Sequence, residues 1–283
     1  MKAIQINRRH FLHAGLLGST LALAGSAGAA VVKPKLPPDD GLKLGMASYT
    51  YRKFSLDDAI KMTVDAGLKY INLKDVHLPY KSTKEERQAA HAKVEAAGLK
   101  LMGGGVIYIK NDEQDVKDKF DYCVDAGMPV IVCSPEPEIL DAVEKMAKQT
   151  GVLVAIHNHG PGDKKYPSPM DVYNMVKDRD PIMGICMDIG HTARIGVDPV
   201  ECVEKCGDRL HDMHFKDENS ATPKGSPVEV GRGVLDIVGV FKALKARNYP
   251  YHIGLEYEAH GDDPQPGVRE SIGYARGVLA AIG

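Results

Sequence analysis

Short apolar runs recur along the chain at regular intervals, and segments with a helical repeat separate them. Eight of these runs predict strands, at residues 42–48, 69–74, 99–103, 129–133, 152–157, 183–188, 210–215 and 252–256. The helical repeat predicts eight helices, at 56–66, 84–97, 116–126, 139–149, 169–176, 199–206, 238–247 and 267–281. Eight alternating units in about 240 residues predict an α/β fold with one domain, a closed (β/α)8 TIM barrel, rather than an open doubly wound sheet.

Glycines mark the ends of several predicted helices. Gly67, Gly98 and Gly127 each follow an alanine and precede the next predicted strand, where a glycine can adopt the left-handed conformation that ends a helix. The triple glycine at 103–105 follows the third strand without the pattern of a phosphate-binding helix. We therefore expect a close backbone approach at the barrel mouth rather than a nucleotide site.

The N-terminal segment resembles a twin-arginine (Tat) signal peptide. Arg8 and Arg9 precede a weakly apolar run, and the small residues at 27–29 form a cleavage site. The alternatives are a membrane anchor or a chance apolar helix, but the run is shorter than the roughly 20 residues that span a bilayer. We predict a signal at 1–29, a proline-rich linker at 30–41 and a catalytic barrel at 42–283. The processed protein would be periplasmic or otherwise extracytoplasmic, with no stable membrane insertion.

Charge and cysteine content narrow the classes of partner. The net charge is −2 and becomes −5 once the predicted signal, with its three basic residues, is removed. Such a surface does not attract phosphate backbones, so no nucleic acid partner is expected. The five cysteines are an odd number and cannot all pair within the chain. Most lie in apolar patterns that predict core positions.

Histidines and carboxylates gather at the ends of four consecutive predicted strands. The fifth strand ends in His157, the sixth in Asp188, the seventh in His214 and the eighth in Glu256. Barrel active sites lie at the carboxyl ends of the strands, and a shared divalent cation would offset the cost of burying these groups. Mixed imidazole and carboxylate ligands suit Mn, Co, Fe or Zn, and disfavour Mg, which prefers oxygen ligands.

These strand ends also resemble a known family. The motifs are Met187-Asp188-Ile189-Gly190-His191, Met213-His214-Phe215-Lys216-Asp217, Leu255-Glu256-Tyr257 and Val230-Gly231-Arg232-Gly233-Val234-Leu235-Asp236. They resemble the xylose-isomerase-like barrel superfamily, most closely its sugar phosphate isomerase/epimerase group, over essentially all of 42–283. The group includes ketose 3-epimerases and inosose-processing enzymes.

The resemblance implies roles for individual residues. Asp188, His214 and Glu256 would be metal ligands, and His191 would contact a substrate hydroxyl. The fourth ligand of the family is usually a glutamate ending the fifth strand, where this chain has His157. A mechanism with two opposed glutamates therefore cannot be transferred whole, and His157 could be a metal ligand or the general base.

Further candidates lie near the same strand ends. Lys74 could act in catalysis by stabilising an oxyanion or as a base of lowered pKa. His77, His159, Lys216 and Arg232 are candidate substrate contacts. For Lys74 and His77, a solvated loop is the alternative interpretation.

The predicted function is that of a divalent-metal-dependent sugar isomerase or epimerase, working through a metal-bound enediolate with Glu256, His157 and Lys74 as catalytic residues. The first alternative is a metal-dependent lyase or hydrolase that cleaves 3-keto-glycosides by β-elimination, which predicted export and His157 favour. The second is a non-catalytic carbohydrate-binding barrel, which the full set of candidate ligands disfavours. Each requires a small carbohydrate partner, and the sequence leaves the sugar, the metal and the oligomeric state open.

Overall fold

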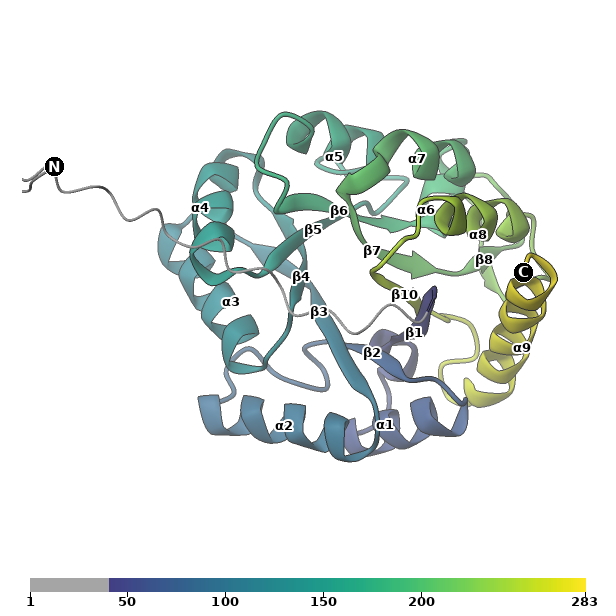
Figure 1. Cartoon of the computed structure of the whole chain (residues 1–283), viewed down its shortest axis with the longest axis horizontal. Helices are drawn as coiled ribbons and strands as arrows, with labels where there is room; N and C mark the ends of the chain where they lie inside the picture. The colour runs from purple at the N-terminus through teal and green to yellow at the C-terminus, as the bar shows by residue number, and fades with distance from the viewer. Residues whose placement is uncertain (1–40) are drawn as a thin grey trace, which may run out of the picture. The chain divides into compact units, whose positions relative to one another are not determined.

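The eight predicted strands form a closed parallel barrel. The computed structural model describes residues 41–283, in which the strands close in the order β1-β10-β7-β6-β5-β4-β3-β2 (Figure 1). Their bounds are β1 (Lys43–Ala47), β2 (Tyr70–Leu73), β3 (Lys100–Ile109), β4 (Val130–Pro135), β5 (Leu153–His157), β6 (Met183–Asp188), β7 (Leu210–Phe215) and β10 (His252–Leu255). The predicted fold class is confirmed. The predicted signal at 1–29 lies outside the described residues.

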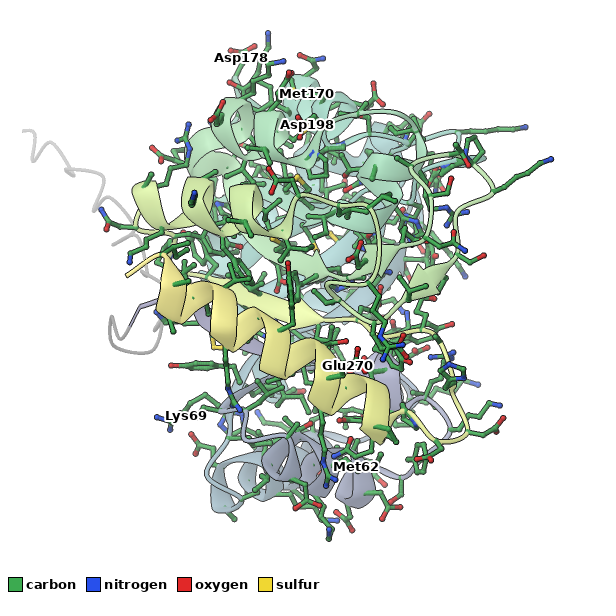
Figure 2. All side chains as sticks on the ribbon, turned by 90° about the vertical axis from the view of Figure 1, so that its right-hand side faces the viewer. Met62, Lys69, Met170, Asp178, Asp198 and Glu270 are labelled. Atoms are coloured by element: carbon green, nitrogen blue, oxygen red, sulfur yellow. The ribbon has the colours of Figure 1, made fainter. Side chains whose placement is uncertain are left out.

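Helices follow the strands and surround the barrel (Figures 1 and 2). They are α1 (Leu56–Asp65), α2 (Lys84–Ala96), α3 (Glu113–Asp125), α4 (Leu140–Thr150), α5 (Pro169–Val176), α6 (Ile189–Arg194), α7 (Pro199–Cys206), α8 (Ile237–Ala246) and α9 (Gln265–Ala281), with short 3-10 turns η1 (Ser48–Tyr51), η2 (Pro137–Ile139) and η3 (Gly207–Arg209). All but α6 correspond to predicted helices. No helix in 41–283 combines the length and apolar character needed to cross a bilayer.

Local signals explain the helix boundaries. Thr83 begins α2 with a capping box, in which its side chain accepts from the backbone of Glu86 and the Glu86 carboxylate accepts from the Thr83 N–H. Gly67, Gly98 and Gly127 lie one residue beyond the C-caps of α1, α2 and α3 with positive φ, as predicted.

Two features of the strands differ from the predictions. The triple glycine at 103–105 lies inside β3, which extends to Ile109, and not after the strand. A Cβ on Gly103 would lie 2.6 Å from the Val130 carbonyl oxygen, so a close approach occurs, but it lies between β3 and the start of β4 and not at the predicted barrel mouth. After β7, a small antiparallel pair forms from β8 (Asp217–Glu218) and β9 (Pro227–Val228), which the periodicity did not predict.

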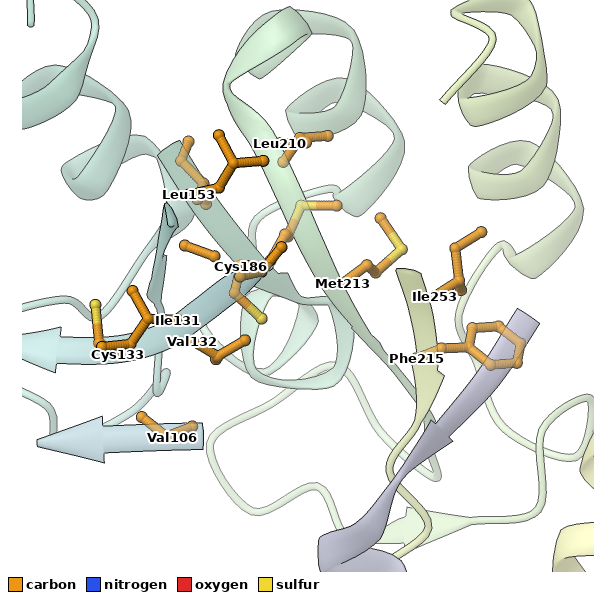
Figure 3. Close-up of a cluster of buried hydrophobic side chains, with 14 of the residues drawn as sticks. Val106, Ile131, Val132, Cys133, Leu153, Cys186, Leu210, Met213, Phe215 and Ile253 are labelled. Atoms are coloured by element: carbon orange, nitrogen blue, oxygen red, sulfur yellow. The ribbon is translucent and has the colours of Figure 1, made fainter. Parts of the chain in front are cut away.

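Apolar side chains fill the space between the strands and around them (Figure 3). The cluster drawn there includes Val106, Ile131, Leu153, Met213 and Phe215, all buried. The five cysteines are likewise buried and carry free thiols, which confirms their predicted core positions. Buried polar side chains also lie lower in the barrel, where the Asn72 amide donates to Asp212 at 2.7 Å, and others gather at the carboxyl ends of β5, β6, β7 and β10.

Candidate metal centre

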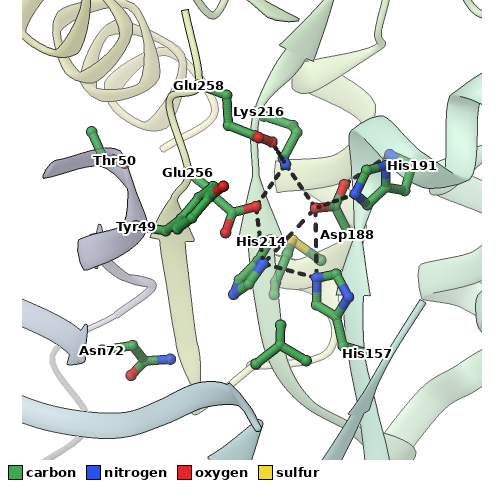
Figure 4. A network of polar contacts seen from close by, with 12 residues as sticks. Tyr49, Thr50, Asn72, His157, Asp188, His191, His214, Lys216, Glu256 and Glu258 are labelled. Carbon is green, nitrogen blue, oxygen red and sulfur yellow. Dashed lines mark hydrogen bonds and ion pairs between the residues drawn. The ribbon is translucent and has the colours of Figure 1, made fainter. Parts of the chain in front are cut away.

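Four side chains converge at the carboxyl ends of neighbouring strands (Figure 4). His157 ends β5, Asp188 ends β6, His214 lies near the end of β7, and Glu256 follows β10 directly. The parallel register places Asp188 opposite His214. All four residues are buried, and one candidate ligand atom from each lies within 4.8 Å of the others.

The distances within this group fit a single divalent cation. His157 Nε2 lies 2.9 Å from His214 Nδ1 and 3.6 Å from Asp188 Oδ2. His214 Nδ1 lies 3.3 Å from Glu256 Oε2 and 3.8 Å from Asp188 Oδ2. Ligands bound at about 2.0–2.2 Å to one ion lie about 3–4 Å apart. Two imidazole nitrogens and two carboxylate oxygens are also a donor set that binds transition metals.

Lys216 lies inside the same group and binds three carboxylates. Its Nζ is 2.6 Å from Glu256 Oε2, 2.6 Å from Glu258 Oε1 and 2.9 Å from Asp188 Oδ2. Burial alone would lower the pKa of Lys216, but the three carboxylates outweigh it and hold the pKa well above its usual value. The side chain is only 2% exposed, so the site contains a permanent buried positive charge.

The same charges fix the protonation of the carboxylates. Burial would raise the pKa of Asp188, but His191 and Lys216 hold it well below its usual value. For Glu256, burial is outweighed by His214 and Lys216, and the pKa is again well below its usual value. Both carboxylates are therefore ionised at neutral pH.

The two imidazoles behave differently. Burial, with His214 nearby, lowers the pKa of His157 well below its usual value, so this ring is neutral at pH 7. Burial would also lower the pKa of His214, but the Glu256 and Asp188 carboxylates outweigh it and raise that pKa. A neutral His157 has a lone pair available to a cation.

Two more predicted residues lie beside this group. The rings of His157 and His159 are 4.5 Å apart between centroids, and His159 Nδ1 lies 3.1 Å from Asp163 Oδ2. His191 Nε2 lies 4.0 Å from Asp188 Oδ2, and its backbone N–H donates to Asp188 Oδ1, because Asp188 is the N-cap of α6. The unpredicted helix α6 thus orients one candidate ligand and places His191 at the rim.

The structure places three predicted residues outside the group. Lys74 Nζ donates to the carbonyl of Val106 at 3.1 Å. Both ring nitrogens of His77 are engaged by the first 3-10 turn, Nδ1 with Ser48 Oγ and Nε2 with the Tyr51 carbonyl oxygen. Arg232 is exposed and pairs with Glu270 on α9, the helix at the front of Figure 2.

Glu258 was absent from the predicted site. It follows Glu256 by two residues, and alternation along an extended chain puts both side chains on one face. This spacing is the signal that could have found it. Its contact with Lys216 joins it to the charged cluster of Asp188, Lys216 and Glu256.

Histidines and carboxylates at successive strand ends of a closed parallel barrel are typical of a TIM-barrel enzyme with a metal centre. The chain belongs to the Xylose isomerase-like TIM barrel family, whose sequence pattern it matches over residues 60–278. This membership supports the predicted isomerase/epimerase-like enzyme.

The proteins that this chain resembles include a dehydratase and two epimerases. The chain is 22% identical over 192 residues to inosose dehydratase of Lacticaseibacillus casei, which is 62% of this chain and 64% of that protein. The crystal structure of 3-keto-D-glucoside 4-epimerase from E. coli is similar with a TM-score of 0.67 at 16% identity, covering 83% of this chain and 99% of the epimerase. That of D-psicose 3-epimerase has a TM-score of 0.66 at 14% identity, covering 85% and 98%. At these identities the structural matches establish the fold alone.

Proposed function

We propose that this protein is a divalent-metal-dependent sugar isomerase or epimerase, with His157, Asp188, His214 and Glu256 as the metal ligands. The observation that carries the proposal is the convergence of these four buried side chains within 4.8 Å. Mn, Co, Fe or Zn suits the mixed ligands better than Mg. The ion would act as a Lewis acid that polarises a carbonyl and acidifies the neighbouring C–H bond.

Within this proposal, Glu256 removes the proton from that carbon. Its carboxylate is ionised because His214 and Lys216 keep its pKa low, and Oε2 faces both of them, so Oε1 is the oxygen that takes the proton. Lys216 holds Glu256 and Asp188 in place and offers a positive charge to a developing oxyanion. His191 and His159, at the rim of the site, contact substrate hydroxyl groups. Lys74, His77 and Arg232 lie outside the group and have no part in this step.

A second candidate follows from the residue that ends β5. His157 stands where a second carboxylate would be needed for paired removal and return of a proton, and it is already engaged with His214. With one carboxylate base, a substrate that carries a leaving group β to its carbonyl would undergo elimination instead. The alternative reaction is therefore lyase cleavage of a 3-keto-glycoside or loss of water from a keto-polyol. The inosose dehydratase similarity is consistent with it.

The discriminating experiment follows proton exchange and product formation together. The full-length protein, loaded with one metal at a time, would be incubated in D2O with a panel of ketoses and 3-keto-glycosides and followed by NMR. Deuterium in a ketose accompanied by a new epimer supports the isomerase, whereas release of the aglycone supports the lyase. Glu256→Gln should abolish either product, and Glu270→Gln, on the outer helix α9, is the matched control. Protein that binds no metal and leaves every substrate unchanged would refute both.

We also propose export by the Tat pathway, on the strength of Arg8, Arg9 and the segment that follows them. Replacing both arginines by lysine should keep the protein inside the cell. Cell fractionation measures this, and export unaffected by the double replacement would contradict it.

A further inference from the structure

Cys186 lies in the barrel interior directly below the candidate metal centre. It precedes Asp188 by two residues on β6, so both side chains are on the same face of the strand. The register places Cys186 opposite His157 on β5. Its Sγ and one ring nitrogen each from His157 and His214 lie within 4.8 Å of one another, which makes a second possible ligand set that shares both histidines.

The two sets differ in the kind of cation that they suit. Asp188 and Glu256 offer oxygen, whereas Cys186 offers sulfur. Thiolate and imidazole ligands select soft ions, and carboxylates select hard ones. Three protein ligands with an open fourth position are also a common arrangement for zinc.

A buried thiol is usually a packing residue, and Cys133 on β4 is an example. Cys186 differs because two imidazoles reach it. In addition, His157 Nδ1 is buried and has no hydrogen-bond partner among the described residues. The nitrogen of this ring that faces His214 Nδ1 is Nε2, at 2.9 Å.

We propose that His157, Cys186 and His214 form a second cation site, which takes a soft divalent ion such as Cd²⁺ or Zn²⁺. On binding, the Sγ–H bond breaks, a bond forms between Sγ and the ion, and the proton passes to the buffer. The two sites are mutually exclusive because each requires both histidines. A soft ion bound with Cys186 therefore prevents a hard ion from binding with Asp188 and Glu256. This inference does not depend on which sugar reaction the protein performs.

Cadmium titration tests the proposal directly. Full-length protein, stripped with a chelator, would be titrated with Cd²⁺ while the ultraviolet thiolate-to-cadmium charge-transfer absorption is recorded. The measurement is made in a Cys202→Ser, Cys206→Ser background, because these thiols lie one helical turn apart on α7 and could bind cadmium themselves. We expect a band that saturates at one ion per chain, and no band with Mn²⁺.

Cys186→Ser should remove the band and weaken cadmium binding by at least about 10-fold, as expected for the loss of a soft ligand. Mn²⁺ affinity should stay within about twofold. Cys133→Ser, which alters a buried strand thiol outside both ligand sets, is the matched control and should keep the band. A band that survives Cys186→Ser overturns the proposal.

A second measurement needs no variant. In crystals of the unaltered protein soaked with cadmium, the anomalous signal should place the ion within bonding distance of Cys186 Sγ. An ion bonded to Asp188 and Glu256, with Sγ out of reach, would also overturn the proposal. Catalysis with Mn²⁺ is measured separately, so failure of the soft site and failure of the proposed enzyme function remain distinguishable.

Discussion

Replacing Lys216 by methionine removes a buried lysine that contacts two of the candidate ligands, Asp188 and Glu256. The ammonium of Lys216 touches three carboxylates at 2.6–2.9 Å and is 2% exposed. Removing one partner of a buried ion pair typically costs about 3–5 kcal/mol, because the other partner is left buried without compensation. For a domain of this size, each kcal/mol shifts the Tm by about 2–4 °C. We therefore expect Lys216→Met to lower the Tm of the metal-free protein by about 6–20 °C.

The metal should reverse much of this loss. A divalent cation bound by Asp188 and Glu256 supplies the positive charge that the variant lacks, so it should stabilise the variant more than the unaltered protein. At a free metal concentration of about 100 times the Kd, binding adds about 2.7 kcal/mol of stability. Tighter binding by the variant would add to this value.

Scanning calorimetry in chelator and in Mn²⁺ measures both effects. Lys205→Met is the control, since that lysine forms an exposed pair with Glu201 on α7 and should leave the Tm unchanged. The reasoning is refuted if Lys216→Met and the unaltered protein have the same Tm in chelator. It is also refuted if Mn²⁺ raises the Tm of the variant less than the Tm of the unaltered protein.

Three further predictions concern pH and packing. Metal affinity should fall as the pH drops through the raised pKa of His214, because the ion must then displace a proton. Calorimetric titration at several pH values tests this, and a pH-independent Kd would contradict it. His211, whose pKa burial lowers from 6.5 to about 4, must stay neutral in the fold, so stability should fall by about 3 kcal/mol between about pH 6.5 and 4. Urea unfolding should show a shallower pH dependence in His211→Gln, and equal slopes would exclude this cause. Gly273→Ala in α9, where a Cβ meets nothing within 4 Å, should add about 0.5–1 kcal/mol, and a lower Tm would contradict it.

The strands and helices could be predicted because each has a complete local signal. β5, for example, is an apolar run that ends in His157. The start of α2 is marked by the capping box of Thr83 and Glu86. Once eight such units close into a barrel, the ends of successive strands must meet. The proximity of the four candidate ligands therefore follows from topology.

Side-chain direction beyond a strand end does not follow from topology. His77 was predicted as a substrate contact, and the engagement of both its ring nitrogens by Ser48 and the backbone of Tyr51 was not predicted. Lys216 was predicted as a substrate contact, and its contacts with three carboxylates were not predicted. Neither orientation is encoded in a repeat, because each depends on contacts between segments far apart in the sequence.

The charges of the cluster give one reason for a divalent ion. Asp188, Glu256 and Glu258 contribute three negative charges, and Lys216 neutralises one of them. With His157 neutral, two negative charges remain in a region where Asp188 is fully buried. Uncompensated buried charge is costly, and the Glu256 and Asp188 carboxylates raise the pKa of His214, which favours a proton on this ring. A proton offsets one charge, whereas a divalent cation offsets both and leaves the imidazole free to bind it.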